Sequence, residues 1–207
     1  MPTKTLCLAL TGASGMPYGI RLLECLLGAG HQVQLLYSPA AQIVARQEMS
    51  LDLPSRPSDA QNFLRERFSA LPGKLDVFGR EEWFAPVASG SNPPDAMVVC
   101  PCTMGTLAAI AQGLSNNLIE RAADVVLKEG RKLILVPRET PFSAIHLENM
   151  LRLSRAGAVI LPPNPGFYHH PESVADVINF VVARILDQLG IAHQLMPRWG
   201  SANREGL

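Results

Sequence analysis

Short apolar runs that alternate with helical patterns constrain the fold of this 207-residue chain more than any other feature. The runs are apolar throughout, which indicates strands covered on both faces of a sheet. Alternation with helices predicts a Rossmann-like, doubly wound parallel sheet, an α/β fold with three α/β/α layers. The expected strands span residues 5–10, 32–37, 74–78 (a weaker pattern), 96–100, 132–137 and 158–162, and the expected helices span residues 16–29, 39–47, 60–70, 103–112, 117–129, 143–156 and 171–189.

The composition fits a single domain over residues 1–207, because 47% hydrophobic residues can fill one core. The 18 basic and 18 acidic residues cancel, and no basic block points to nucleic acid or a charged membrane. No apolar segment approaches the roughly 20 residues that span a bilayer. Lys4 leads straight into a strand without a targeting leader, so we expect a cytoplasmic protein. The tail, residues 190–207, leaves the sheet–helix pattern and is a candidate contact with a neighbouring subunit.

The four cysteines give no metal or redox signature. Cys100 and Cys102 flank a proline, and neither a second pair nor a nearby histidine accompanies them. We therefore expect buried free thiols and no metal site.

Unusual side chains gather in five loops that each follow an expected strand. In a parallel sheet such loops meet at the carboxyl edge, where ligands bind. The clustering therefore predicts an active site at that edge. The loops are TGASG (11–15), SPAAQ (38–42), PCTMGT (101–106), PRETPF (137–142) and PPNPGFYHH (162–170).

The first loop is a glycine turn that can approach a phosphate or a flat ring. The dinucleotide spacing G-x-G-x-x-G is absent, and residues 31–47 contain no acidic residue for a ribose. A mononucleotide is therefore favoured, with Ser14, Ser38 and the backbone of residues 12–15 as contacts. For this loop alone, a tight turn without a ligand remains the alternative.

A second anion site is indicated by Thr103 and Thr106, which open an alanine-rich helix. Ordinary capping by Thr103 is the alternative, but capping does not need the second threonine. Arg121, Asp124 and Lys128 share a helix face, which is either a solvated stripe or a phosphate contact.

Other charged and aromatic residues stand in places that suggest chemistry. Arg184 falls beside an apolar helix stripe, where it either pairs with Glu172 or Asp176 or binds an anion. Arg138 and Glu139 follow a strand directly and offer a cation and a proton carrier. Glu48 lies at the same sheet edge, and Tyr168 adds a phenol. Trp83 and Trp199 lie outside regular elements and either fill the core or cover a carbocation.

Taken together, these motifs resemble the UbiX-type flavin prenyltransferases from Thr5 to Gly200. The segments that carry the resemblance are LTGASGMPYG, CPCTMGTLAAIAQGLSNNLIERAADVVLKE, LVPRETPFSAIHLENMLRLSRAGAVILPPNPGFYHHPES and PRWG. Pro17 departs from the family pattern, in which a Gln or similar residue is expected, but proline suits the first turn of a helix. The resemblance implies an enzyme that transfers a dimethylallyl group from dimethylallyl phosphate to N5 and then C6 of reduced FMN, without a metal. It also implies a product, prenylated FMN, for a UbiD-type decarboxylase, and a large homo-oligomer, commonly a dodecamer, with sites between subunits.

The resemblance further implies residue roles. It places Gly12, Ala13 and Ser14 at the isoalloxazine, with Ser14 near N5, and completes the FMN site with Ser38, Thr103, Met104, Gly105, Thr106 and Arg138. It assigns the prenyl phosphate to Tyr168, Arg184, Lys128, Arg121 and Glu139. Glu48 and Glu139 would carry protons, and Trp199 would face the allyl cation. Trp83 is a further candidate for the prenyl side, as an aromatic lid.

Two alternatives were weighed against this interpretation. An FMN-dependent decarboxylase of the cysteine decarboxylase type shares the glycine turn. It carries P-A-S-A-N-T in place of PCTMGT, however, and uses a histidine that residues 32–145 lack. A non-catalytic flavin carrier would need the turn, but it would not need a second anion contacted by Arg121, Lys128, Glu139 and Arg184. The sequence leaves open whether the prenyl donor is a monophosphate or a diphosphate.

Overall fold

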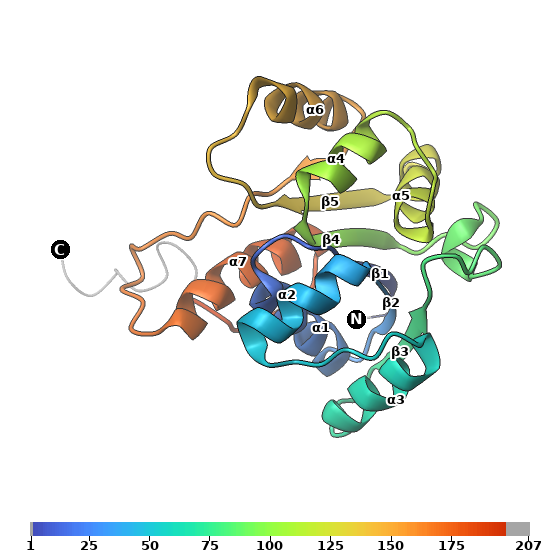
Figure 1. The fold of residues 1–207 in the computed structure, drawn as a ribbon. Coiled ribbons are helices and arrows are strands. Elements are labelled where there is room, and N and C mark those ends of the chain that lie inside the picture. The colour runs from blue at the N-terminus through green and yellow to red at the C-terminus, as the bar shows by residue number, and fades with distance from the viewer. Residues whose placement is uncertain (1, 198–207) are drawn as a thin grey trace.

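The computed structural model describes residues 2–197, and its centre is one parallel sheet of six strands (Figure 1). The strands are ordered β3-β2-β1-β4-β5-β6. Every neighbouring pair is parallel, so all carboxyl ends lie at one edge. The bounds are Thr5–Leu10 (β1), Gln32–Tyr37 (β2), Lys74–Phe78 (β3), Ala96–Cys102 (β4), Lys132–Pro137 (β5) and Val159–Ile160 (β6).

Helices cover both faces of the sheet, which confirms the predicted three layers (Figure 1). Alternate residues of a strand point to opposite faces. Leu6 and Leu8 of β1 therefore join the core under α1, α2, α3 and α7, while Cys7 and Ala9 join the core under α4, α5 and α6. The helices span Met16–Gly28 (α1), Pro39–Met49 (α2), Pro57–Arg67 (α3), Met104–Ala111 (α4), Leu118–Lys128 (α5), Ala144–Arg155 (α6) and Val174–Leu189 (α7), with a short 3-10 helix, η1, at Pro86–Ala88.

The six expected strands are confirmed, but several element bounds differ from expectation. β6 ends at Ile160 and not at residue 162, and α2 ends at Met49 and not at residue 47. β4 runs two residues further, to Cys102, with a register shift after Val99. α3 begins at Pro57 and not at residue 60, because proline is pre-shaped for a first helical turn. α7 begins at Val174 and not at residue 171, since Ser173 and Asp176 cap it reciprocally.

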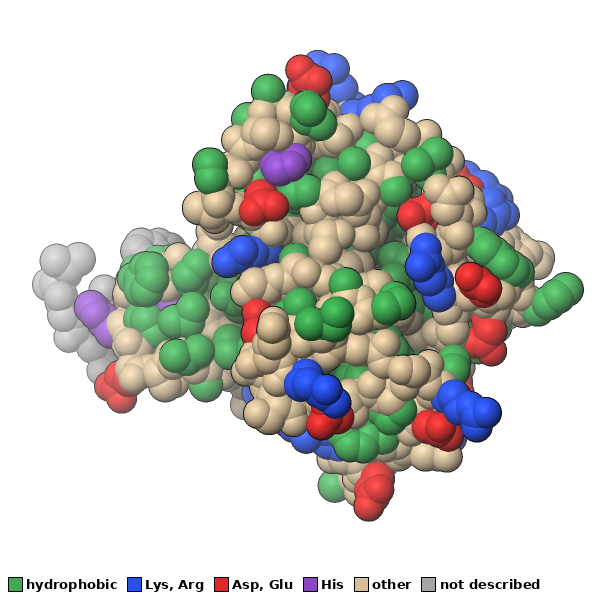
Figure 2. Space-filling model, viewed as in Figure 1, with side chains coloured by type: hydrophobic (Ala, Val, Ile, Leu, Met, Phe, Trp, Pro, Cys, Tyr) green, Lys and Arg blue, Asp and Glu red, His purple; other side chains and the backbone are tan. Residues whose placement is uncertain are grey.

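Within residues 2–197, no helix is both long enough and apolar enough to cross a membrane. On the face shown in Figure 2, basic and acidic side chains are interspersed. This face therefore carries no continuous basic patch of the kind that follows a nucleic-acid backbone.

The loops after β1 and β4 are joined at the point where the strand order reverses. Thr11, which is 1% exposed, donates its hydroxyl to the carbonyl of Pro101 at 2.8 Å. The same hydroxyl accepts from the backbone N–H of Thr103, also at 2.8 Å. In open α/β sheets this reversal creates the crevice in which ligands bind. The Thr11 bridge therefore sets the spacing of the two loops that line the crevice.

Helix α1 lies unusually close to β4 at Gly19. A Cβ atom added there would overlap the carbonyl oxygen of Cys100 and would stand 2.6 Å from Leu10 Cδ2. Because the nearest obstacle is backbone, neither partner can move aside cheaply. The absence of a side chain at Gly19 thus allows α1 to pack directly on the central strand.

We expect Gly19→Ala to lower the free energy of unfolding by about 1–3 kcal/mol, the usual cost of overpacking a core. The loss should appear although alanine favours a helix over glycine by about 1 kcal/mol. Urea unfolding measures it. The matched control is Gly28→Ala at the end of the same helix, where an added Cβ meets nothing within 4 Å. Equal stability of the two variants would contradict this account of the α1–β4 contact.

Candidate functional site

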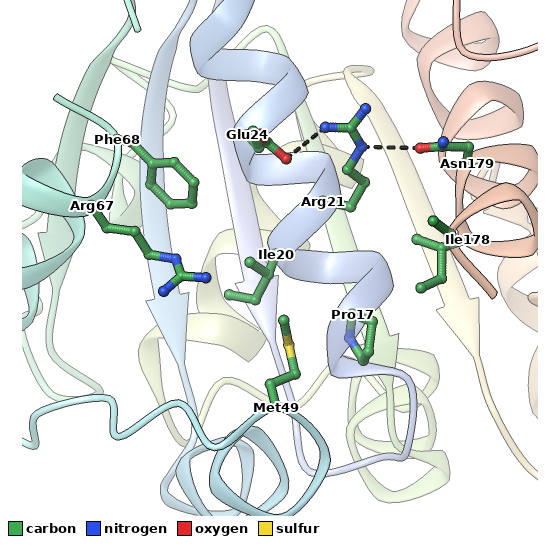
Figure 3. Close-up of a pocket in the computed structure, with 10 residues that line it drawn as sticks. Pro17, Ile20, Arg21, Glu24, Met49, Arg67, Phe68, Ile178 and Asn179 are labelled. Atoms are coloured by element: carbon green, nitrogen blue, oxygen red, sulfur yellow. Dashed lines mark hydrogen bonds and ion pairs between the residues drawn. The ribbon is translucent and has the colours of Figure 1, made fainter. Parts of the chain in front are cut away.

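The largest hollow in the described residues is a groove of about 570 Å³ along the outer side of α1 (Figure 3). Its polar groups are engaged with one another. Arg21 contacts Glu24 at 2.6 Å and Asn179 at 3.0 Å, and Arg67 lies 6.0 Å from the ring centre of its neighbour Phe68. No residue of the five loops predicted to carry chemistry lines this groove, so the candidate site is located elsewhere.

Two smaller hollows share the glycine turn at the carboxyl edge of the sheet. The first, about 390 Å³, is formed by residues 11–12, 38–40, 80, 103, 106, 117 and 119, and we call it the threonine hollow. The second, about 410 Å³, is formed by residues 14–15, 18, 137–142 and 162–164, and we call it the Arg138 hollow. Gly12 lines the first and Ser14 lines the second, so consecutive parts of one turn face both.

Three helices begin at the threonine hollow. Ser38 caps α2 by accepting from the N–H of Ala41 at 3.2 Å, and Thr103 caps α4 by accepting from the N–H of Thr106 at 3.1 Å. Asn117 caps α5 through two backbone N–H groups at 3.0 and 3.1 Å. Helix starts carry positive partial charge, so three of them around one hollow favour an anion there.

The second threonine has a structural role as well as a place in the hollow. Thr103 donates its hydroxyl to the hydroxyl of Thr106 at 2.9 Å. Both side chains line the hollow, and Met104 lies buried between them in the sequence, at 9% exposure. Gly105 is exposed, and a Cβ atom there would meet nothing within 4 Å. The structure thus brings the predicted 103–106 segment beside Ser38 and Gly12.

Three residues of the threonine hollow were missed as contacts from sequence. Thr11 was placed in the loop of residues 11–15 without a role of its own, although a threonine directly after an apolar run is a usable signal. Asn117 stands directly before a helical pattern, which is the position of an N-cap. Arg80 lies in the charged run GREEW and had no distinguishing signal, because only the path of the loop after β3 brings it to the hollow.

The start of α1 is occupied by a carboxylate of the chain itself. Gly15 has the left-handed φ of 113° and precedes the helix. Glu48 accepts from the N–H of Gly15 at 3.0 Å and from the N–H of Met16 at 2.8 Å. These donors are therefore not free for a phosphate, which favours a ring over a phosphate as the partner of the glycine turn. Ala13, in the same turn, is 8% exposed.

The Arg138 hollow combines a cation, a hydroxyl and a carboxylate. Arg138 and Ser14 are exposed, and Glu139 is half-buried and accepts from the N–H of Thr140 at 3.2 Å. Tyr18 also lines it. Burial raises the pKa of the Tyr18 phenol above its ordinary value, and nearby Cys100 and Glu48 add to the rise.

Tyr168 and Arg184 line a third hollow of about 400 Å³, together with Phe180 and Asp187. Arg184 pairs with Asp187 at 2.6 Å, with 50% of its side chain exposed. The alternative pairing with Glu172 or Asp176 is therefore wrong, because Asp187 lies one turn along the same helix. Asp176 instead accepts from the residues that cap α7.

Within one chain, Arg121 and Lys128 line neither the Arg138 hollow nor the hollow of Tyr168 and Arg184. Arg121 donates to the carbonyl of Ala88 at 3.0 Å and pairs with Asp124 at 2.8 Å. Lys128 pairs with Glu129 at the far end of α5, just before β5 begins, and so lies at the amino edge of the sheet. Trp83 is 45% exposed and lines none of the three hollows described above. Trp199 lies outside the described residues.

All four cysteines are free thiols. Burial raises the pKa of Cys7 and of Cys102 to about 12, and it raises the pKa of Cys100 further. Within residues 2–197, no group of three or more His, Cys, Asp or Glu side chains could hold a metal ion.

We expect Glu48→Gln to lower the free energy of unfolding by about 1 kcal/mol, since it removes a charge that caps a helix start. Circular dichroism during urea unfolding measures this change. Glu148→Gln, on the exposed side of α6, is the matched control. If both variants were as stable as the parent protein, the Glu48 contacts would contribute nothing to the turn.

Comparison with known proteins places the chain among the flavoproteins. Residues 1–186 match the family model described as Flavoprotein. The chain is 59% identical over 197 residues to the flavin prenyltransferase UbiX of Pseudomonas aeruginosa. The aligned region covers 95% of this chain and 94% of that protein. It is 47% identical to the flavin prenyltransferase UbiX of Methanocaldococcus jannaschii, and the alignment covers 93% of this chain and 96% of that protein.

Solved structures agree with these relatives. AnUbiX (PadA1), in complex with FMN and dimethylallyl pyrophosphate, has a TM-score of 0.85 at 39% identity, covering 96% of this chain and 98% of that one. A dodecameric FMN-dependent UbiX-like decarboxylase from Escherichia coli O157:H7 has a TM-score of 0.82 at 43% identity. The match covers 94% of this chain and 98% of that one. With a flavoprotein model over most of its length and close relatives over nearly all of it, the chain belongs to the UbiX family of flavin prenyltransferases.

Proposed function

We propose that this flavin prenyltransferase joins the dimethylallyl group of dimethylallyl phosphate to N5 and C6 of reduced FMN. The observation that carries the proposal is the arrangement of two hollows around one glycine turn. The threonine hollow is surrounded by helix starts and suits a phosphate. The Arg138 hollow is lined by the end of the glycine turn, where Glu48 already caps the start of α1 and leaves no free N–H groups for a phosphate. A mononucleotide with a flat ring needs this combination.

The residues of the chain divide between the two ends of FMN. The threonine hollow, with Ser38 and the 103–106 segment, would hold the phosphate, because its hydroxyls and helix starts favour negative charge. Gly12, Ala13 and Ser14 would contact the ring system, and Arg138 would complete that side. Reduced FMN is the acceptor substrate and supplies the nucleophilic ring positions. The chain's part is to hold the ring and to keep water away from it.

The prenyl phosphate requires cations where negative charge grows as phosphate departs. Tyr168 and Arg184 form one half of such a site, and Glu139 lies with Arg138 in another hollow. Arg121 and Lys128 lie elsewhere in the chain, so we place them in a site shared between subunits of a homo-oligomer. The related UbiX-like decarboxylase of known structure is a dodecamer, which supports this arrangement.

The remaining roles follow from the same chemistry. An allyl cation is protected by aromatic surfaces and by exclusion of water. We assign that task to Trp199, in the tail 190–207 near a neighbouring subunit, with Trp83 as a second candidate. Of the two proposed proton carriers, Glu139 has the freer carboxylate, because both oxygens of Glu48 accept backbone N–H groups.

Several finer points stay predictions. We treat residues 1–207 as one domain, we name a UbiD-type decarboxylase as recipient of the product, and we expect the enzyme in the cytoplasm. AnUbiX was solved with the diphosphate donor, so both donors belong in the assay. A cysteine decarboxylase chemistry is not favoured, since the related FMN-dependent cysteine decarboxylase TvaF is 20% identical with a TM-score of 0.52 and shows the fold alone.

The direct test mixes the purified protein anaerobically with reduced FMN and dimethylallyl phosphate. We expect the extracted flavin to be heavier by one dimethylallyl unit, as measured by mass spectrometry. Oxidised FMN serves as the control and should stay unmodified. Unmodified flavin with both the monophosphate and the diphosphate donor would refute the transferase activity.

We expect Arg184→Ala to raise the KM for dimethylallyl phosphate about tenfold, the effect of losing one charged contact to an anion. FMN binding should stay unchanged, because Arg184 lines a different hollow. The lost pair with Asp187 is half-exposed and should cost less than about 1 kcal/mol of unfolding free energy.

Steady-state kinetics at saturating reduced FMN measures the change in KM. The matched control is Arg46→Ala, which also loses an exposed ion pair, with Asp52. An unchanged KM in Arg184→Ala, or an equal rise in both variants, would remove Arg184 from the prenyl phosphate site.

A further inference from the structure

The threonine hollow contains one charged side chain among the described residues that line it, and that side chain is Arg80. The other lining groups are hydroxyls, the Asn117 amide and apolar atoms, and none is a carboxylate. Within residues 2–197, the Arg80 guanidinium makes no hydrogen bond and no ion pair. An unpaired cation therefore stands at a hollow where the starts of α2 and α4, which have no acidic residue in their first turn, add positive partial charge.

Two of the nearby acidic side chains are engaged elsewhere, and the third, the exposed Glu81, makes no ion pair with Arg80 among the described residues. Glu82 accepts from the N–H of Gly79 within the same loop. Glu120 accepts from the N–H of Asn116 at 2.8 Å and from the Asn117 amide at 2.7 Å. These carboxylates hold the loop after β3 and the start of α5, and neither neutralises Arg80.

The backbone of Arg80 is fixed at the hollow. Its carbonyl accepts from the N–H of Leu118, at the first residue of α5, at 2.8 Å. This bond ties the loop after β3 to the helix whose cap, Asn117, lines the same hollow. The cation is therefore held beside the three helix starts by the fold and does not depend on a long flexible connection.

We propose that Arg80 binds the terminal phosphate of FMN and makes the enzyme select FMN over riboflavin, the same flavin without that phosphate. The proposal rests on the proposed function, which places the FMN phosphate in the threonine hollow. A planar guanidinium can give two parallel hydrogen bonds to phosphate oxygens, which hydroxyls and helix starts alone do not provide. Riboflavin offers no charge to Arg80, so its affinity should not depend on this residue.

The test measures the Kd of the full-length protein for FMN and for riboflavin by quenching of flavin fluorescence. For Arg80→Gln we expect the Kd of FMN to rise about tenfold, while the Kd of riboflavin changes less than about twofold. The contact is partly exposed, so added salt should weaken FMN binding more in the parent protein than in the variant. Arg80→Lys keeps the charge without the planar fork and should fall between the two.

The matched control is Arg155→Gln, which removes the same charge from the exposed last turn of α6 and should bind both flavins like the parent protein. An unchanged FMN affinity in Arg80→Gln would overturn the proposal, and so would an equal loss for both flavins. Failure of the proposed function looks different. The parent protein would then bind neither flavin, which overturns both ideas, or it would bind FMN selectively through Arg80 and yet form no prenylated product.

Discussion

One buried hydroxyl holds together the part of this protein on which the rest of the site depends. Thr11 joins the loop after β1 to the loop after β4, across the point where the strand order reverses. Without that hydroxyl the N–H of Thr103 would lose its partner, at a cost of about 1–3 kcal/mol, whereas the carbonyl of Pro101 would keep its bond to the N–H of Thr11 at 3.2 Å. The bond also sets how far the glycine turn lies from the start of α4, so the two hollows share one wall.

The four helix starts around the glycine turn and the threonine hollow are used in two ways. α1 is capped by Glu48, a carboxylate that the chain supplies itself. α2 and α4 are capped only by neutral side chains and have no acidic residue in their first turn, so their positive ends stay uncompensated, whereas α5 carries Glu120 in its first turn. The chain thus places its own negative charge at the starts of α1 and α5 and leaves the starts of α2 and α4 attractive to an anion. This division separates a phosphate end from a ring end within a single crevice.

Sequence patterns predicted the sheet, its layers and most loop residues, because strand alternation and helix caps are local properties. The hollow around Ser38, Thr103 and Thr106 followed from such local signals. Arg80 did not, since its position depends on the path of a loop that crosses from β3 to the start of α5. The position of Lys128 was predictable but overlooked, because a helix that returns from the carboxyl edge must end at the amino edge. The alternative partners considered for Arg184, Glu172 and Asp176, were wrong because an acid one helical turn away is nearer than acids two or more turns away.

The direct contact of α1 with β4 at Gly19 has a consequence for how a ligand is received. With no side chain between helix and strand, there is no compressible layer that could let α1 slide when the crevice fills. The entropic cost of ordering α1 against β4 is therefore met when the chain folds and not when a ligand binds. A ligand meets a surface that is already preorganised. The loops of residues 137–142 and 162–164, which line the Arg138 hollow, do not share this contact and keep more freedom to fit a ligand.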